Sequence, residues 1–197
     1  MSSPKTRFTV VMLSCVTGLS GCTASNAARS VVPSYDDYTR RLLQLSADQN
    51  GDGRIDRWEY FDADGRLSTV GSSSRGDGVE DTWSSTTATA AGETEIDRSS
   101  RRDRVRDRHE FYKGPTLLRT EEDTNEDGLI DQWNRYEGPV LREVAFDLSF
   151  SKGRPDRRSA YDARGRFTGV EIDPDGDGTF VAAPGEPEKP RRPGVTK

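Results

Sequence analysis

The stretch DQNGDGRIDRWEYFDADGRL, residues 48–67, decides the fold of this chain. It begins with an acidic, glycine-rich segment, continues with the aromatic segment RWEYF, and reaches the turn-forming segment DADG. Only about five residues separate Asp56 from this turn, which is too few for a stable helix but normal for a strand. The stretch therefore predicts an acidic loop followed by a β-hairpin.

This unit recurs along the chain with a period of about 25 residues. The period is marked by aspartates at spacings of 25, 26, 24 and 25, which are Asp56, Asp81, Asp107, Asp131 and Asp156. Two residues after the markers stand Trp58, Trp83, His109, Trp133 and Arg158. Shortly before the markers stand Gly53, Gly78, Gly128 and Gly153, with Arg104 as the exception. We expect a mainly β fold in which tandem hairpin repeats stack like a solenoid over residues 48–181.

Two flanking segments depart from the repeat. Residues 34–47 have Ser34 as a candidate N-cap, Asp36 and Asp37 in the first turn, and apolar residues at helical spacing. They predict one short helix that caps the first repeat. Residues 182–197 are rich in proline and charge without periodicity, which predicts a disordered tail.

The N-terminus has the order of an export signal. Lys5 and Arg7 precede an apolar run that is too short to span a bilayer, and the run ends in Leu-Ser-Gly-Cys at Cys22. This ending resembles the lipobox of bacterial lipoproteins. The resemblance implies a signal peptide over residues 1–21, lipid attachment at Cys22, a tether over residues 22–33, and a protein held at the membrane of the cell envelope by acyl chains. Thr23 is not the aspartate of inner-membrane retention, so the outer membrane is favoured.

The loop of the first unit carries the ligand pattern of a calcium site. Calcium takes six to eight oxygen ligands, which alternate positions of a tight loop supply economically. Positions 1, 3, 5, 7, 9 and 12 are filled by Asp48, Asn50, Asp52, the carbonyl of Arg54, Asp56 and Glu59. With Gly53 at position 6, the match to an EF-hand loop is complete.

Two further loops carry part of this pattern. The fourth supplies Asp123, Asn125, Asp127, the carbonyl of Leu129 and Asp131, with Asn134 at position 12. The last supplies Asp173, Asp175 and Asp177, with Val181 at position 9. Positions 1, 3 and 5 of the remaining loops are Ser73, Arg75 and Asp77, then Ser99, Arg101 and Asp103, then Leu148, Phe150 and Lys152. We expect Ca²⁺ in a subset of the loops, at modest affinity, and a solvated turn elsewhere.

The marker aspartates persist even where the other ligands are lost. We infer that the frame of each unit does not depend on metal, and that each marker has a second role, accepting backbone N–H bonds in its turn.

The unit D-x-N-x-D-G-x-x-D-x-W resembles the EF-hand-like, thrombospondin type 3-like calcium repeats of exported bacterial lipoproteins. The resemblance covers roughly residues 48–180. It implies calcium binding in an envelope-anchored protein with a structural or binding role, and no assigned activity.

Other classes of function fit less well. Without the signal residues the formal net charge falls from −5 to −7, which disfavours nucleic acid as a partner. One histidine, no nucleophile motif and no phosphate loop disfavour an enzyme, and His109 has the phase of a packing position. The alternative is a metal-independent adhesion or interaction module that contacts an envelope protein, a surface protein or a glycan through its tryptophans. A true helical EF-hand would instead require much helix.

Overall fold

The computed structural model describes residues 30–149 and 153–185. Within these ranges the chain forms β-strands and no helix. The thirteen strands are β1 (Val31–Tyr35), β2 (Leu42–Ala47), β3 (Arg57–Phe61), β4 (Leu67–Ser72), β5 (Thr82–Ser85), β6 (Thr94–Arg98), β7 (Arg108–Lys113), β8 (Thr116–Glu122), β9 (Gln132–Glu137), β10 (Val140–Phe146), β11 (Arg157–Tyr161), β12 (Phe167–Ile172) and β13 (Val181–Ala182).

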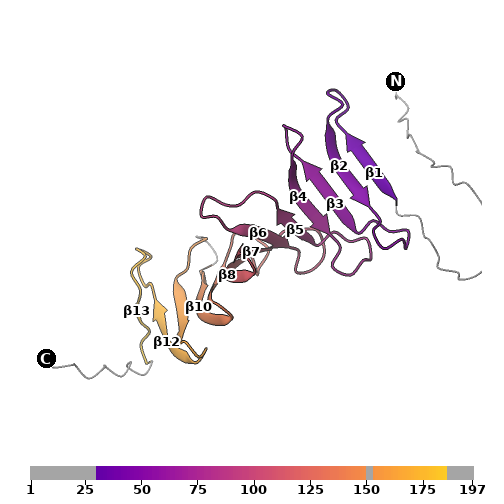
Figure 1. Ribbon diagram of the computed structural model, residues 1–197. Helices are drawn as coiled ribbons and strands as arrows, with labels where there is room; N and C mark the ends of the chain where they lie inside the picture. Colours follow the sequence, from indigo (N-terminus) through magenta and orange to yellow (C-terminus); the bar gives the residue numbers. More distant parts are fainter. Residues whose placement is uncertain (1–29, 150–152, 186–197) are drawn as a thin grey trace, which may run out of the picture.

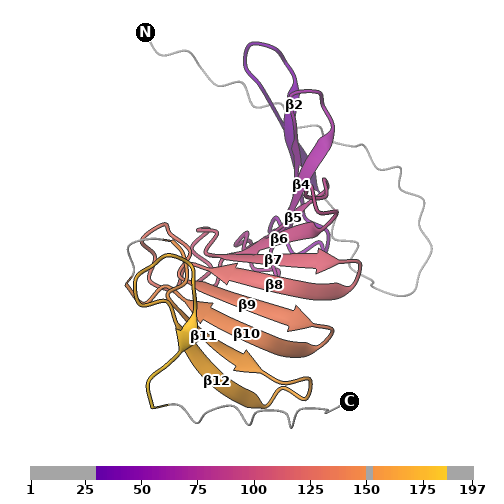
Figure 2. The same cartoon turned by 90° about the vertical axis from the view of Figure 1, so that its left-hand side faces the viewer.

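The strands form one open antiparallel sheet whose order in space is their order in sequence. Figure 1 shows β1–β4 at one end and β10–β13 at the other, with no second layer on either face. Figure 2 shows β2 and β4 almost upright while β7–β10 run across the view, so the strand direction rotates strongly along the sheet, as twisted sheets require. The mainly β prediction is confirmed. The hairpins join edge to edge through backbone hydrogen bonds instead of packing face to face as in a solenoid.

Short turns and long loops alternate between the strands. The tight turns of most hairpins are followed or preceded by a β-bulge, with register shifts at Ser34/Tyr35, Tyr60/Phe61, Phe111/Tyr112, Leu141/Glu143 and Ala160/Tyr161. The turn between β5 and β6 is longer, over residues 86–93. Bulges increase local twist, so their recurrence beside the turns contributes to the rotation of the sheet.

One row of residues crosses the sheet at the level of the tryptophans. Directly opposite residues in antiparallel strands point to the same face. The row runs through Trp58, Gly71, Trp83, Asp97, His109, Glu121 and Trp133. The residues at the tryptophan phase of the repeat therefore share one face, but a small or acidic residue separates each from the next.

The packing on both faces mixes apolar and charged side chains. Only four hydrophobic side chains of the described residues are buried, namely Trp83, Phe111, Ala145 and Val170. Arginines cover some of the aromatic rings, with Arg106 4.7 Å from the Trp83 ring centre and Arg119 3.6 Å from that of Phe111. Cation–π contacts of this kind stabilise by about 0.5–2 kcal/mol, according to their exposure. The thin core that the composition predicts is thus supplemented by arginine stems and ion pairs.

The predicted cap helix over residues 34–47 is wrong. Residues 31–35 and 42–47 are β1 and β2, which pair with each other. The predicted N-cap, Ser34, lies in β1, and a local turn forms instead at Asp36, whose Oδ1 accepts the N–H groups of Tyr38 and Thr39 at 3.1 and 2.7 Å. The chain then turns back through Arg40, whose φ is +60°. Pairing of β2 with β3 satisfies its backbone and packs its leucines, so tertiary contacts override the local helical pattern.

Several predicted segments lie wholly or partly outside the described residues. The signal peptide, Cys22 and residues 22–29 of the tether belong to this group, as do residues 186–197 of the tail. Val31–Pro33, predicted as tether, lie in β1, and Ala182, predicted as tail, lies in β13. Among the described residues, no helix has the length and apolar character to cross a membrane.

Candidate functional site

Six loops connect the strands at one end of the sheet, that is, at the same ends of the hairpins. We name them loop 1 (48–56), loop 2 (73–81), loop 3 (99–107), loop 4 (123–131), loop 5 (147–156) and loop 6 (173–180). Figure 2 shows the later loops gathered at the left of β7–β12, opposite the tight turns. The first residue of each loop donates its N–H to the marker carbonyl of the loop before it: Ser73 to Asp56, Ser99 to Asp81, Asp123 to Asp107, Asp147 to Asp131 and Asp173 to Asp156, at 2.8–2.9 Å. The loops are therefore held side by side by the backbone.

The marker aspartates accept backbone N–H bonds inside their own loops. Asp56 accepts from Gln49 and Asn50, and Asp131 accepts from Thr124 and Asn125. The pattern also holds in loops without the full ligand set: Asp81 accepts from Ser74, Asp107 from Ser100, and Asp156 from Leu148 and Ser149. The second role expected for the markers is confirmed, and it explains why they persist where other acidic residues are lost.

Loops 1 and 4 share one hydrogen-bond frame. Asp48 accepts the N–H of Gly51 at 2.6 Å and that of Gly53 at 2.8 Å. Asp52 accepts the N–H of Arg54 at 2.9 Å, and Asn50 accepts that of Asp52 at the same distance. In loop 4 the equivalent bonds run from Glu126 and Gly128 to Asp123, from Asp127 to Asn125 and from Leu129 to Asp127. The predicted ligands at positions 1, 3 and 5 thus line the same tight turn in both loops.

Loop 6 repeats this frame without a marker. Asp173 accepts from Gly176 and Gly178, and Asp177 accepts from Thr179 at 2.6 Å. Carboxylate oxygens of Asp173, Asp175 and Asp177 lie within 4.8 Å of one another. Burial opposes ionisation of Asp173, but the backbone N–H bonds outweigh it and lower the pKa of this carboxyl. Three carboxyl groups are therefore held together in one small space.

The residues at positions 4 and 6 adopt the left-handed backbone conformation, with positive φ, in loops 1, 2, 3, 4 and 6. Glycines with φ between +67° and +91° fill both positions in loops 1, 2 and 6. Loop 3 has Arg102 and Arg104 there, at +61° and +74°, and loop 4 has Glu126 at +64°. Arg104, the exception in the glycine pattern, thus adopts the glycine conformation. A non-glycine residue in this region costs about 1 kcal/mol or more.

Loop 2 contains a guanidinium from its neighbour. Arg102 of loop 3 donates to both carboxylate oxygens of Asp77, at 2.6 and 2.8 Å, and its Nε donates to Asp81 at 2.7 Å. These bonds hold the pKa of Asp77 well below its usual range. Burial opposes ionisation of Asp81, but its hydrogen bonds from Ser74 and Arg102 outweigh that effect and lower its pKa. A side chain of loop 3 therefore supplies the positive charge that neutralises the carboxylates of loop 2.

Loop 5 begins one residue earlier than expected. Counting back from Asp156 assigns Leu148 to position 1, yet Leu148 is half exposed and Asp147 is only 1% exposed. Asp147 accepts the N–H of Gly153 at 2.8 Å and the hydroxyl of Ser149 at 2.6 Å. It therefore takes the place of Asp48, and the loop holds one extra residue. Asp147 was missed because a fixed count back from the marker cannot detect an insertion.

The residues at position 12 do not join the loops. Glu59 lies in β3 and accepts a hydrogen bond from Arg57 at 2.9 Å. Asn134 lies in β9, where its amide donates to Thr120 at 2.8 Å. Both side chains belong to the sheet because a strand, rising about 3.3 Å per residue, carries position 12 away from the loop that a helix would bring it back to. Glu59 therefore lies in the sheet and not in loop 1. Among the predicted ligands in the described residues, only Asp173, Asp175 and Asp177 form a group of three carboxylates with oxygens within 4.8 Å of one another.

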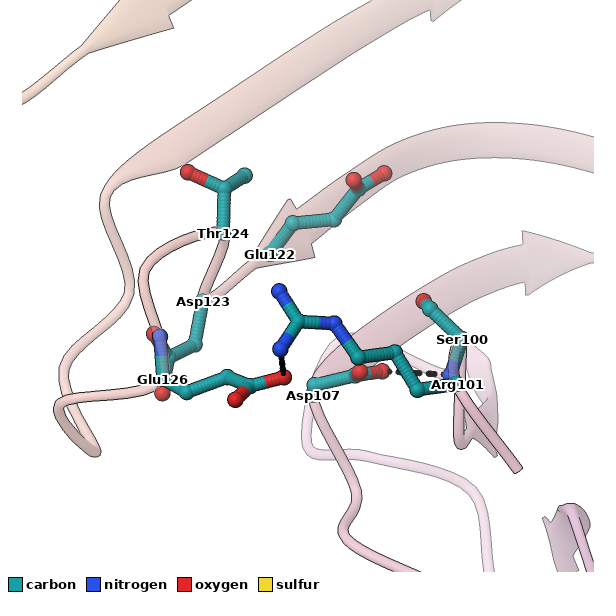
Figure 3. A pocket seen from close by; sticks show the side chains of 7 residues that line it. All are labelled: Ser100, Arg101, Asp107, Glu122, Asp123, Thr124 and Glu126. Atoms are coloured by element: carbon teal, nitrogen blue, oxygen red, sulfur yellow. Dashed lines mark hydrogen bonds and ion pairs between the residues drawn. The ribbon is translucent and has the colours of Figure 1, made fainter. Parts of the chain in front are cut away.

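A pocket of about 200 Å³ lies between loops 3 and 4. It is lined by Ser100, Arg101, Asp107, Glu122, Asp123, Thr124 and Glu126 (Figure 3). Figure 3 shows Arg101 extending from loop 3 to pair with Glu126 of loop 4. The pocket is acidic, and an arginine of the chain itself compensates part of that charge.

A second cluster of possible ligands lies on the tryptophan face. His109 Nδ1 lies 2.7 Å from Asp97 Oδ1 and 3.5 Å from Glu95 Oε1. The hydrogen bond to Asp97 raises the pKa of His109 above its ordinary value. Asp97 also pairs with Arg106 at 3.0 Å, so the cluster already contains a cation. In the sequence His109 has the phase of a packing position, and the cluster could not be found there because its members lie on different strands.

Comparison with known proteins adds no assignment to this geometry. A scan against protein-family models gave no matching family, and a search of curated proteins gave no significant match to the chain.

Proposed function

We propose that this chain is a calcium-binding sheet of the bacterial cell envelope, lipid-anchored at Cys22, with a structural or binding role and with Ca²⁺ held by loops 1, 4 and 6. One observation carries the proposal. In these three loops the aspartate at position 1 fixes the turn through two N–H bonds, so that the acidic or amide side chains at positions 3 and 5 line it.

The charge of loop 6 supports a cation there. Carboxylates whose oxygens lie within 4.8 Å of one another repel, and they repel more strongly where water is partly excluded. Three such carboxylates are held at this spacing by the loop frame. A divalent cation converts the repulsion into attraction.

The donor set favours calcium among the common cations. All the predicted side-chain ligands of loops 1, 4 and 6 are carboxylate or amide oxygens, which are hard ligands. Calcium tolerates irregular coordination completed by carbonyls and water, whereas magnesium demands near-octahedral geometry. With position 12 displaced into the sheet, the protein supplies fewer ligands than an EF-hand. We expect dissociation constants in the range of about 0.1–1 mM, which is typical of extracellular modules.

The aromatic face gives less support to the alternative function. Trp83 is only 4% exposed and is covered by Arg106. The large exposed hydrophobic side chains include Val31, Val32 and Tyr35 of the edge strand β1, but none of the tryptophans. A glycan-binding strip of tryptophans would need open ring faces.

Calorimetric titration of the full chain with Ca²⁺ tests the proposal. Asp52→Asn and Asp127→Asn each remove a charge but keep an oxygen that can accept the same N–H, and together they should weaken binding markedly. The matched control is Asp64→Asn, because Asp64 lies in the turn between β3 and β4, at the end of the strands opposite to the six loops. Saturable heat that the control retains and the double variant largely loses supports the proposal. Equal heat in both variants would exclude loops 1 and 4 as the sites.

A further inference from the structure

We propose that the guanidinium of Arg102 occupies in loop 2 the place that calcium occupies in loops 1, 4 and 6. Loop 2 is then held closed by a positive charge of the chain itself and needs no metal ion. The assignment of calcium to the other loops rests on the proposed function. The assignment of Arg102 to loop 2 rests on its own contacts.

The contacts of Arg102 fall on the ligand positions of loop 2. Asp77 is the fifth residue of this loop, as Asp52 is of loop 1, and Asp81 is the ninth, as Asp56 is of loop 1. The guanidinium places two N–H groups on Asp77 and one on Asp81, at 2.6–2.8 Å. A planar guanidinium with a forked set of donors matches carboxylates in this two-pronged way, and an arginine keeps its charge at any physiological pH.

Loop 2 also offers few ligands to a metal ion. Position 1 is Ser73, whose hydroxyl donates to the Asp77 carboxylate at 3.1 Å and accepts the N–H of Asp77 at 3.2 Å, but which has no carboxylate to offer a metal ion. Position 3 is Arg75, which brings a further positive charge. Loop 2 thus retains carboxylates at only two ligand positions, Asp77 and Asp81, and both are already bonded to Arg102, which leaves too few free oxygens for calcium.

The backbone of Arg102 gives an independent sign that its side chain is required. Its φ of +61° is the conformation that Gly51, Gly76 and Gly176 adopt at the same position of their loops. An arginine is strained in this conformation, which glycine adopts freely. The side chain is also largely enclosed, with 18% of its surface exposed. Three charge-assisted hydrogen bonds from an enclosed side chain offset that strain, whereas a glycine would avoid the strain but supply no cation.

Loop 3 also reaches its other neighbour, loop 4. Arg101 pairs with Glu126 (Figure 3), while Arg102 pairs with loop 2. Adjacent residues of loop 3 therefore connect to the loops on both sides. This arrangement implies that removal of calcium loosens loops 1 and 6 while loop 2 stays closed.

Amide hydrogen exchange in the full chain tests the assignment, with Ser74 and Val79 as reporters. Their N–H groups donate to Asp81 and Asp77, the two carboxylates that Arg102 holds. Arg102→Ala should speed exchange at both amides by about tenfold or more. Arg104→Ala is the matched control. Arg104 lies in the same loop and has a similar backbone conformation, but it makes no ion pair among the described residues.

Chemical rescue separates a cation site from a general loss of packing. Guanidinium chloride at about 20 mM, far below denaturing concentrations, should restore slow exchange in Arg102→Ala, while the same concentration of sodium chloride should not. Unchanged exchange in Arg102→Ala, or faster exchange at Ser74 and Val79 of the unsubstituted chain after calcium chelation, would overturn the proposal. If chelation changes no amide in any loop, the calcium function fails while the result for Arg102 stands separately.

Discussion

The Nδ2 atom of Asn134 donates a hydrogen bond of 2.8 Å to Oγ1 of Thr120, directly across β8 and β9. Thr120 is fully buried and Asn134 is 7% exposed, although the sheet has no second layer over them. The centre of this sheet is therefore closed by a satisfied polar pair and not by an apolar cluster.

Replacing this hydroxyl should destabilise the sheet. Thr120→Val leaves the buried amide of Asn134 without its acceptor, and we expect the free energy of unfolding to fall by about 1–3 kcal/mol in urea denaturation. Thr120→Ser keeps the hydroxyl and should lose less. Thr116→Val is the control, because its hydroxyl makes no hydrogen bond within the described residues. No loss in Thr120→Val, or a larger loss in Thr120→Ser, would show that the methyl group matters and the hydrogen bond does not.

Relieving backbone strain in loop 3 should stabilise the protein. Arg104 has φ +74°, the glycine conformation of position 6 in the other loops. Arg104→Gly removes the strain at some cost in unfolded-chain entropy, and we expect a net gain of about 0.5–1 kcal/mol in the free energy of unfolding. Thermal denaturation measures it. A loss of stability would mean that the Arg104 side chain makes a contribution larger than the strain.

The offset of loop 5 predicts unequal effects at two adjacent residues. Asp147→Ala removes the buried acceptor of Gly153 and should cost about 2–3 kcal/mol in the free energy of unfolding. Leu148→Ala should cost less than about 1 kcal/mol because Leu148 is half exposed. Urea denaturation of both variants measures the difference, and a larger cost at Leu148 would restore the register counted back from Asp156.

The pair of His109 and Asp97 predicts a pH dependence of stability. The hydrogen bond to Asp97 raises the pKa of His109 in the folded state, and Glu95 and Glu121 act in the same direction while burial opposes it. A raised pKa stabilises the fold fully below the unfolded value of 6.5, and this stabilisation is lost as the pH rises through the folded pKa. The unsubstituted chain should therefore lose more stability than His109→Gln between about pH 5.5 and pH 8.5. Parallel losses would show that His109 does not titrate with folding.

The lipid anchor predicts a covalent modification at Cys22. Cells fed with labelled palmitate should incorporate label into the chain and not into a Cys22→Ser variant, because the thiol carries the lipid. The control is Cys15→Ser, which changes the cysteine inside the predicted signal peptide. Label in Cys22→Ser, or none in the unsubstituted chain, would contradict the anchor.

Much of the sheet could be predicted from the sequence because its signals are local. The five residues from Asp56 to the turn at DADG are too few for a helix, and β3 ends at Phe61 as this spacing requires. The markers bond to amides six to eight residues away, so their role also follows from the loop sequence. The helix over residues 34–47 could not be rejected in this way, because its apolar residues have helical spacing and only the pairing of β2 with β1 and β3 overrides that local pattern.

The parts that the sequence did not reveal depend on contacts between units. Arg102 reaches Asp77 across 25 positions of the chain, and no motif links an arginine to an aspartate at that separation. The cluster of His109, Asp97 and Glu95 arises from the pairing of β6 with β7. Such contacts follow from strand register, which bulges and an enlarged turn make hard to count.

The most direct test of the account is the melting temperature of the full chain as a function of free Ca²⁺, from chelator to several times the expected dissociation constant. Binding to the folded state alone raises stability as RT ln(1 + [L]/Kd), so the melting temperature should rise progressively with calcium. The rise should be absent with magnesium at the same concentrations and largely lost in the Asp52→Asn, Asp127→Asn double variant. A melting temperature that calcium leaves unchanged would contradict the account and identify the acidic loops as turns closed by hydrogen bonds alone.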